Sequence, residues 1–245
     1  MFCLPPASGL SWGFAGLARH LSPGRPLYGL QSRGLVPGQD RAGSLAEVVA
    51  EQTALIRDTQ PQGPYHLLGY SMGGLVAYDI AVGLQAAGEQ VALLTLLDAF
   101  PGAWLRQGPD RSDRPALLRS LLGILGRPLP EDDTEPLTER RFAELVRRVD
   151  DMPGSLDDAE LAALVEVTAD NRRLLGEFTP EQYRGNLLFF TAAHDPDAVP
   201  DRFRAWQPYV EGRIDNHDVA CAHGEMTRPG ALDRIGPVLD SRLHQ

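Results

Sequence analysis

Short apolar segments alternate along the chain with stretches of helical periodicity. The first apolar segment begins at residue 2, and later ones predict strands over residues 26–31, 65–70, 91–97, 186–192 and 213–221. Several of these segments place apolar residues on both faces, as strands buried between two helical layers do. Strands that alternate with helices predict an α/β domain with a mostly parallel central sheet.

Helices are expected in the intervals between these strands. Ser44 and Glu47 have the spacing of a capping box, which predicts a helix from there to about residue 59. A second helix is predicted over residues 72–87, where Gly88 ends it. Apolar side chains recur at helical spacing near the end of the chain and mark the last helix, at Leu232, Ile235, Leu239 and Leu243.

The stretch from Trp104 to Phe178 differs from the rest because it contains no convincing strand. It carries two apolar helical faces, formed by Phe142, Leu145, Val146 and Val149 and by Leu161, Leu164, Val165 and Thr168. About 75 residues without secondary structure would be unusual in a compact domain. We therefore expect one domain over residues 1–245, with a helical insertion at 104–178 after the strand that ends at Asp98.

The charge, the lengths of the apolar runs and the cysteines exclude several classes of partner, location and cofactor. The 245 residues include 23 Lys and Arg and 33 Asp and Glu, a net charge of −10 that argues against nucleic acid or an anionic membrane as partner. No run of about 18 apolar residues is present, so no transmembrane helix is expected. The two cysteines, Cys3 and Cys221, lack metal-ligand spacing, which favours a reducing, cytoplasmic location over a disulfide scaffold. No metal motif or dinucleotide fingerprint indicates a bound cofactor.

The strongest local motif is Gly69-Tyr70-Ser71-Met72-Gly73, which lies between a predicted strand and a predicted helix. G-x-S-x-G in this context is typical of the nucleophile elbow of α/β-hydrolases. The sharp turn holds the serine in strained backbone geometry, and glycines let strand and helix approach closely. Ser71 would then stand at the N-terminus of a helix whose dipole favours a developing oxyanion.

A serine nucleophile needs a general base, and the hydrolase fold requires the chain order Ser, acid, His. Three of the six histidines precede Ser71 or lie at the chain end: His20, His66 and His244. Of the others, His223 follows the last predicted strand directly, in a loop at the carboxyl edge of the sheet where the base must lie. We therefore favour His223, with His217 and His194 as alternatives.

The acid has two candidates that position alone barely separates. Asp98 and Asp195 each end a predicted strand, where catalytic groups of parallel sheets gather. The oxyanion hole needs the N–H of the residue after the nucleophile, Met72, and one N–H from a loop after an early strand. Residues 5–9 form the only small-residue loop of that kind, and Ala7 is its natural donor because the two prolines before it lack an N–H.

Five segments together resemble the thioesterase domains that end nonribosomal peptide synthetases, most of all those of siderophore-type assembly lines. They are residues 2–9, 63–74, 87–91, 96–98 and 221–226. The likeness spans nearly the whole chain except the insertion, where such domains vary. The resemblance implies Asp98 rather than Asp195 as the acid, beside Ser71 as nucleophile and His223 as base.

The resemblance also implies a function and a partner. The Ser71 hydroxyl would accept a peptidyl chain from the phosphopantetheine arm of an upstream carrier domain, with Ala7 and Met72 as oxyanion donors. The acyl-enzyme would be resolved by water, or by an internal nucleophile that cyclises or oligomerises the chain. The insertion would form a helical lid over the acyl chain, and no other cofactor is implied.

Two alternatives remain open. A free-standing editing thioesterase shares the same triad, although its elbow more often has His before the serine, where this chain has Tyr70. A strand-like segment at residue 2 leads us to expect a domain of a longer protein instead. The second alternative, a catalytically inactive hydrolase fold that serves as a binding module, usually lacks the Ser or the His, and here Ser71, Asp98 and His223 are all present.

Overall fold

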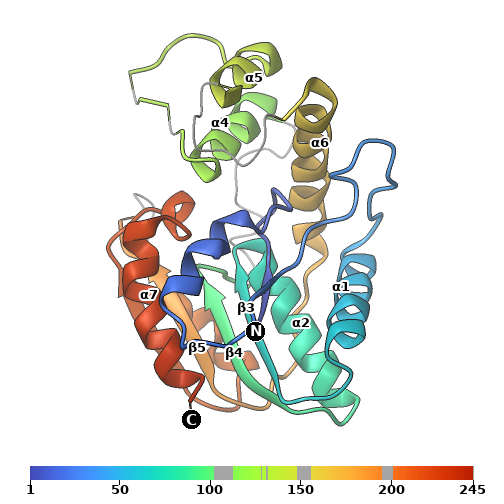
Figure 1. Cartoon of the computed structure of the whole chain (residues 1–245), viewed down its shortest axis with the longest axis vertical. Helices are drawn as coiled ribbons and strands as arrows, with labels where there is room; N and C mark the ends of the chain where they lie inside the picture. The colour runs from blue at the N-terminus through green and yellow to red at the C-terminus, as the bar shows by residue number, and fades with distance from the viewer. Residues whose placement is uncertain (102–112, 128, 131, 148–155, 195–200, 245) are drawn as a thin grey trace.

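The computed structural model describes residues 1–101, 113–127, 129–130, 132–147, 156–194 and 201–244 (Figure 1). Six strands in this part of the chain form one sheet in the order β2-β1-β3-β4-β5-β6, with every neighbouring pair parallel. The strands are β1 Phe2–Leu4, β2 Tyr28–Gly29, β3 Tyr65–Tyr70, β4 Val91–Leu97, β5 Leu187–Ala192 and β6 Ile214–Val219. The predicted α/β class with a parallel sheet is confirmed.

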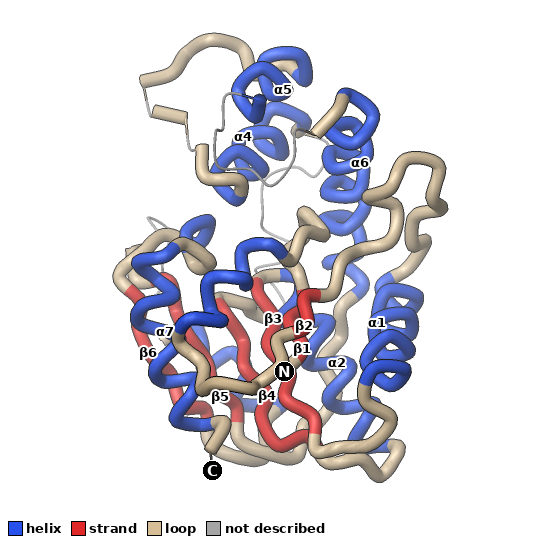
Figure 2. The backbone as a smooth tube through the Cα atoms, viewed as in Figure 1, coloured by secondary structure: helices blue, strands red, loops and turns tan. Residues whose placement is uncertain are grey.

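Helices cover both faces of this sheet (Figures 1 and 2). On one face lie α1 (Leu45–Thr59) and α2 (Met72–Ala86), and on the other lie the 3-10 helix η1 (Trp12–Arg19) and α7 (Pro229–Arg242). The remaining 3-10 segments are η2 (Leu175–Glu177), η3 (Arg202–Tyr209) and η4 (His223–Glu225). No helix among the described residues is long and apolar enough to cross a membrane.

The two-residue period of the strands divides the core into two layers. In β3, Leu67 packs with α1 and α2, whereas Leu68 packs with η1 and α7. In β5, Phe189 and Phe190 divide in the same way. Both faces are therefore buried, which explains the nearly continuous apolar runs in the sequence.

Among the local predictions, one strand and one helix cap differ most from the structure. The strand expected at 26–31 is only Tyr28–Gly29, because β1 offers it few backbone partners before the chain turns at Pro5. The capping box at Ser44 is half formed. The Ser44 hydroxyl accepts from the Glu47 N–H at 3.2 Å, but the Glu47 carboxylate accepts from the Gly43 N–H instead.

The described part of the insertion is helical and contains no strand. It holds α4 (Arg114–Ile124), α5 (Glu139–Arg147) and α6 (Asp158–Leu174), of which α4 and α5 lie above the sheet in Figure 1. These helices share an apolar cluster separate from both layers of the main core, built around Leu121, Phe142 and Leu164. Trp104 and Val149 lie outside the described residues.

Asp79 on α2 makes the stability of the fold depend on pH. Burial raises the pKa of its carboxyl to about 7, and the charge of Glu181 adds to the rise. The folded protein therefore keeps a proton that the unfolded chain, with an ordinary Asp pKa of about 3.9, has already released. The contribution of Asp79 to the free energy of unfolding therefore falls as the pH rises from about 4 to about 7.

We expect Asp79→Asn to remove this dependence. Relative to the unsubstituted protein, the variant should gain more stability at about pH 8 than at about pH 5. Urea unfolding at both pH values measures the difference, and Asp58→Asn, at an exposed position on α1, is the matched control. An equal gain at both pH values would contradict the raised pKa of Asp79.

Candidate active site

Ser71 occupies a sharp turn between β3 and α2. Its backbone has φ 55° and ψ −121°, a conformation that costs a non-glycine residue about 1–3 kcal/mol. Backbone hydrogen bonds hold the turn, since the Ser71 N–H donates to the Leu97 carbonyl and the Gly74 N–H donates to the Ser71 carbonyl, both at 3.0 Å. The hydroxyl therefore stands at the first turn of α2, as the sequence motif predicts.

Two glycines permit this turn by allowing backbone to touch backbone. A Cβ added at Gly69 would lie 2.1 Å from the Gly73 carbonyl oxygen. A Cβ added at Gly73 would lie 2.2 Å from the carbonyl oxygen of Leu4 at the end of β1. Any side chain at either position would push β3, α2 and the loop after β1 apart.

Three segments distant in sequence meet at this point. The Ser71 Oγ lies 3.1 Å from His223 Nε2, and His223 Nδ1 lies 2.6 Å from Asp98 Oδ2. Ser71 follows β3, Asp98 follows β4 and His223 begins η4 after β6, so all three lie at the carboxyl edge of the sheet. A serine hydroxyl, an imidazole and a buried carboxylate joined in this order form a chain that can remove a proton from the hydroxyl.

Asp98 is fixed more tightly than the other two side chains. Its side chain is 1% exposed and its backbone has φ 47°, in the left-handed region. The Asp98 N–H donates to the Phe190 carbonyl at 2.8 Å, and the Asp98 Oδ1 accepts from the Ala192 N–H at 2.9 Å. Strand β5 thus sets both the backbone and the carboxylate of Asp98.

His223 is open on one side, with 39% of its side chain exposed. The Tyr70 hydroxyl donates to the His223 carbonyl at 2.5 Å, and the two rings lie 5.2 Å apart. The Glu225 carboxylate accepts from the N–H of Ala222 at 2.9 Å, which closes the turn from the other side. The loop is held while the imidazole stays accessible to a substrate.

The alternative residues take other positions. His217 lies within β6, where it stacks on Phe190 at 5.4 Å and pairs with Asp215. His194 is exposed after β5. Neither is hydrogen-bonded to Ser71 or Asp98, and Asp195 lies outside the described residues.

The described part of the chain offers no reactive cysteine and no cluster of side chains that could hold a metal ion. Both cysteines are buried and neither forms a disulfide, and burial raises the pKa of Cys3 to about 12, which keeps it a thiol. Within the ranges given above, no group of three or more His, Cys, Asp or Glu side chains is placed to hold a metal ion.

The two expected oxyanion donors lie on adjoining segments. Met72 is the first residue of α2, so its N–H is one of those that a helix leaves unpaired at its N-terminus. Ala7 lies in a turn closed by the Gly9 N–H on the Pro6 carbonyl at 2.8 Å, with Gly9 at φ 75°. The contact of Gly73 with the backbone of Leu4 brings this turn against the start of α2.

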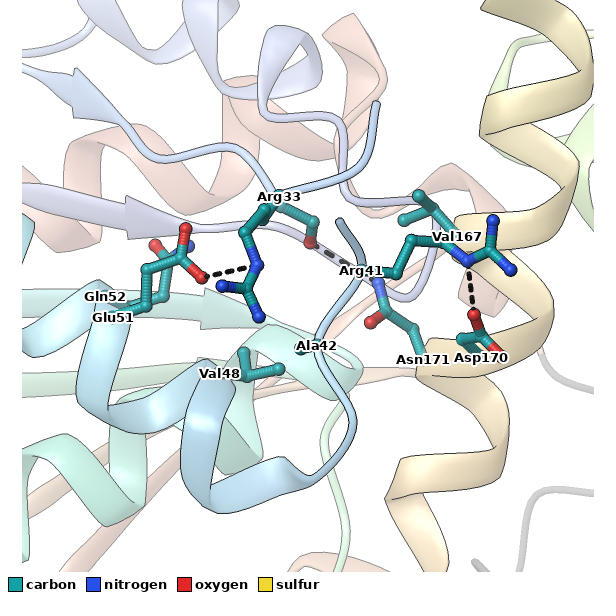
Figure 3. A pocket seen from close by; sticks show the side chains of 10 residues that line it. Arg33, Arg41, Ala42, Val48, Glu51, Gln52, Val167, Asp170 and Asn171 are labelled. Carbon is teal, nitrogen blue, oxygen red and sulfur yellow. Dashed lines mark hydrogen bonds and ion pairs between the residues drawn. The ribbon is translucent and has the colours of Figure 1, made fainter. Parts of the chain in front are cut away.

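A small polar pocket lies behind the Ala7 turn, between α1 and α6 (Figure 3). Asn171 of α6 is buried there, and its amide donates to the Ala7 carbonyl at 2.9 Å and to the Ser32 hydroxyl at 3.3 Å. Beside it Arg41 pairs with Asp170 at 2.6 Å. The last helix of the insertion is thus fastened to the turn that carries Ala7.

Three side chains of the site were not singled out as site residues from the sequence: Tyr70, Asn171 and Arg202. Tyr70 could have been found, because it precedes Ser71 on a strand whose side chains alternate between the two core layers. Asn171 and Arg202 carry no motif. The Arg202 guanidinium contacts Asp98 across 104 positions of sequence, which only the tertiary structure reveals.

Comparison with known proteins identifies the family. The family model described as a thioesterase domain matches residues 1–237. The chain belongs to the thioesterase family. It is 37% identical over its full length to a dimodular nonribosomal peptide synthase of Bacillus subtilis and 32% identical to enterobactin synthase component F of Escherichia coli. It spans 10% of the first protein and 18% of the second, so it corresponds to one segment of each.

Solved structures agree on the fold. A four-domain nonribosomal peptide synthetase bound to AMP and glycine superposes with a TM-score of 0.84 at 22% identity, covering 98% of this chain and 19% of the synthetase. The NocB thioesterase domain in covalent complex with a fluorophosphonate nocardicin G analogue gives 0.71 at 24% identity, covering 100% and 94%. This thioesterase domain therefore has the expected α/β-hydrolase fold and is homologous to a region of nonribosomal peptide synthetases.

The close contact between Gly73 and the backbone of Leu4 predicts that a methyl group added at position 73 lowers both stability and activity. We expect Gly73→Ala to lower the free energy of unfolding by about 1–3 kcal/mol through overpacking, and to slow thioester hydrolysis by displacing the Ala7 turn. Urea unfolding and turnover of a simple thioester measure the two effects.

Gly83→Ala in the same helix is the matched control. A Cβ there meets no atom within 4 Å, so the substitution should stabilise α2 by about 0.5–1 kcal/mol and leave turnover unchanged. Equal behaviour of the two variants would show that the contact between Gly73 and Leu4 does not hold the site together.

Proposed function

We propose that this domain is a serine thioesterase that releases a peptidyl chain from the phosphopantetheine arm of a carrier domain. The observation that carries the proposal is the hydrogen-bonded series Ser71, His223, Asp98 on a nucleophile elbow, in a member of the thioesterase family. Ser71 is the nucleophile, His223 the general base and Asp98 the acid that orients the imidazole.

Acylation follows from this arrangement. His223 Nε2 takes the proton of the Ser71 hydroxyl as Oγ attacks the thioester carbonyl carbon. The N–H groups of Met72 and Ala7 donate to the oxyanion that forms, aided by the N-terminal end of the α2 dipole. When the intermediate collapses, the C–S bond breaks and His223 returns the proton to the departing thiol. Asp98 stabilises the transient imidazolium and keeps Nδ1 turned toward it.

The acyl-enzyme is resolved by a second attack on the Ser71 ester. His223 again removes the proton of the incoming nucleophile and returns it to Ser71 Oγ as the ester bond breaks. Water yields a linear acid, whereas an amine or hydroxyl within the bound chain yields a ring, and the same group of a second chain yields an oligomer. The triad performs the same steps in all three cases, so the nucleophile that reaches the ester decides the product.

We further propose that residues 1–245 act as one domain behind an upstream carrier domain, in the cytoplasm, with the insertion at 104–178 as a lid. The matched relatives are far longer synthetases, which supports the carrier as partner. The two buried cysteines form no disulfide, which supports a reducing compartment. The separate apolar cluster of α4–α6 and the packing of α4 against η4 beside His223 support the lid.

A serine-directed fluorophosphonate tests the nucleophile. Intact mass should show one adduct on the unsubstituted protein and none on Ser71→Ala, while the exposed Ser241→Ala should label fully. Asp98→Asn should slow labelling by up to about 10⁴-fold, far more than Asp195→Asn, because the imidazole loses the group that orients it. Labelling that survives Ser71→Ala would refute the assignment.

The same labelled sample tests the lid. A lid over the acyl chain should exchange its amide hydrogens more slowly in α4–α6 once Ser71 carries the adduct, while exchange in β3 stays constant. Unchanged exchange in all three helices would contradict a covering role.

Carrier delivery predicts a strong preference for a tethered substrate. One peptidyl chain should turn over fastest on a fused carrier, less rapidly on a free carrier and slowest on a small thiol at equal concentration, because tethering supplies an effective concentration in the millimolar range. Initial rates for the three forms measure this order. Equal rates on the small thiol and the fused carrier would favour a general or free-standing esterase.

A further inference from the structure

A buried arginine contacts the carboxylate of the triad. Arg202 is the first residue of η3, and its side chain is 6% exposed beside that of Asp98, which is 1% exposed. The Arg202 Nη2 donates to Asp98 Oδ1 at 3.1 Å and to Oδ2 at 3.3 Å. It also lies 3.4 Å from the Ala192 carbonyl, and the guanidinium carbon sits 4.4 Å above the centre of the Phe100 ring.

The charge of this guanidinium matters because Asp98 is buried. Removing a carboxylate from water is costly unless a counter-charge and hydrogen bonds replace the lost hydration. A neutral His223 supplies a hydrogen bond but no charge. Arg202 supplies the charge, so the negative Asp98 is compensated before His223 takes a proton.

Arg202 also helps to fix the orientation of the Asp98 carboxylate. Oδ1 accepts from the Ala192 N–H at 2.9 Å and takes the shorter Arg202 contact at 3.1 Å, whereas Oδ2 combines the 2.6 Å contact with His223 Nδ1 and the longer Arg202 contact at 3.3 Å. With Oδ1 held from two directions, rotation of the carboxylate away from His223 would break both anchors.

A second hydrogen bond connects helix η3 to the loop after β4. The Trp206 Nε1 donates to the carbonyl of Ala99, the residue after Asp98, at 2.7 Å. Trp206 is fully buried, and its ring lies 4.4 Å from that of Tyr78 on α2. Arg202 and Trp206, four positions apart on η3, thus fasten the Asp98 loop to η3, which packs against α2 through Trp206 and Tyr78.

We infer that Arg202 is a positioning residue of the triad, which balances the charge of Asp98 and locks its carboxylate toward His223. The inference rests on the proposed function, since it concerns the same acyl transfer. Arg202 contributes no atom to the reacting groups, and its effect passes through Asp98. It should therefore govern kcat and the reactivity of Ser71 while leaving KM nearly constant.

The test compares Arg202→Met, Arg202→Lys and the double variant Asp98→Asn/Arg202→Met with the unsubstituted protein. Arg57→Met, which breaks an arginine–carboxylate pair with Glu89 away from the site, controls for loss of an ion pair. The readouts are the rate of Ser71 labelling by a fluorophosphonate, kcat and KM on a peptidyl thioester, and the low-field proton resonance of the bond between His223 and Asp98. Absence of that resonance in His223→Gln assigns it.

Arg202→Met should lower the labelling rate and kcat on the order of 10²-fold, as small misplacements of catalytic groups do, with KM changed little. Arg202→Lys should recover part of the rate, and the low-field resonance should shift in Arg202→Met but not in Arg57→Met. In the Asp98→Asn background the same substitution should cost little more, since two residues that act through one group are not additive.

Contrary outcomes separate this inference from the proposed function. If the unsubstituted protein labels but Arg202→Met labels equally fast, or loses as much rate in the Asp98→Asn background as alone, the positioning role is overturned and the triad stands. If the unsubstituted protein does not label at all, the proposed function fails and the role of Arg202 with it.

Discussion

The contact between backbones at Gly69, Gly73 and Leu4 is the constraint on which the rest of the site depends. It places the end of β3, the start of α2 and the loop after β1 within van der Waals distance, with no side chain between them. The strained Ser71, the N–H of Met72 and the Ala7 turn all receive their positions from it. A helix that began one side chain farther from the sheet would separate Ser71 from Ala7, the proposed nucleophile from a proposed oxyanion donor.

Two of the three non-glycine residues with positive φ in the described part of the chain, Ser71 and Asp98, belong to the proposed triad, and the third, Asp201, precedes Arg202. Ser71 and Asp98 both have positive φ values, and each is held by a backbone hydrogen bond to a neighbouring strand, from Ser71 to Leu97 of β4 and from Asp98 to Phe190 of β5. Each conformation costs about 1–3 kcal/mol, which the buried sheet around it offsets. The parallel sheet thus positions Ser71, Asp98 and His223 relative to one another, because the loops that carry them all leave its carboxyl edge.

The supporting contacts come from segments that the triad motif does not include. Tyr70 holds the His223 loop, η3 holds the Asp98 loop, and Asn171 of α6 holds the Ala7 turn. The last of these ties the insertion to one of the proposed oxyanion donors. Movement of α6 would therefore be transmitted directly to the Ala7 turn through Asn171.

Local sequence patterns determined the main strands and the turn that carries Ser71. The strands at 65–70 and 91–97 and the elbow follow from residues that are neighbours in sequence, since periodicity, turns and caps are set within about one helical turn or strand. Asp98 and Asp195 could not be separated in that way, because each ends an apolar run. Only the fold brings Asp98 to His223 across 125 positions, and it places Arg202 on Asp98 across 104 and Asn171 on Ala7 across 164. Contacts between residues so far apart in sequence depend on how the helical layers pack against the sheet, and the local sequence pattern around each residue does not specify that packing.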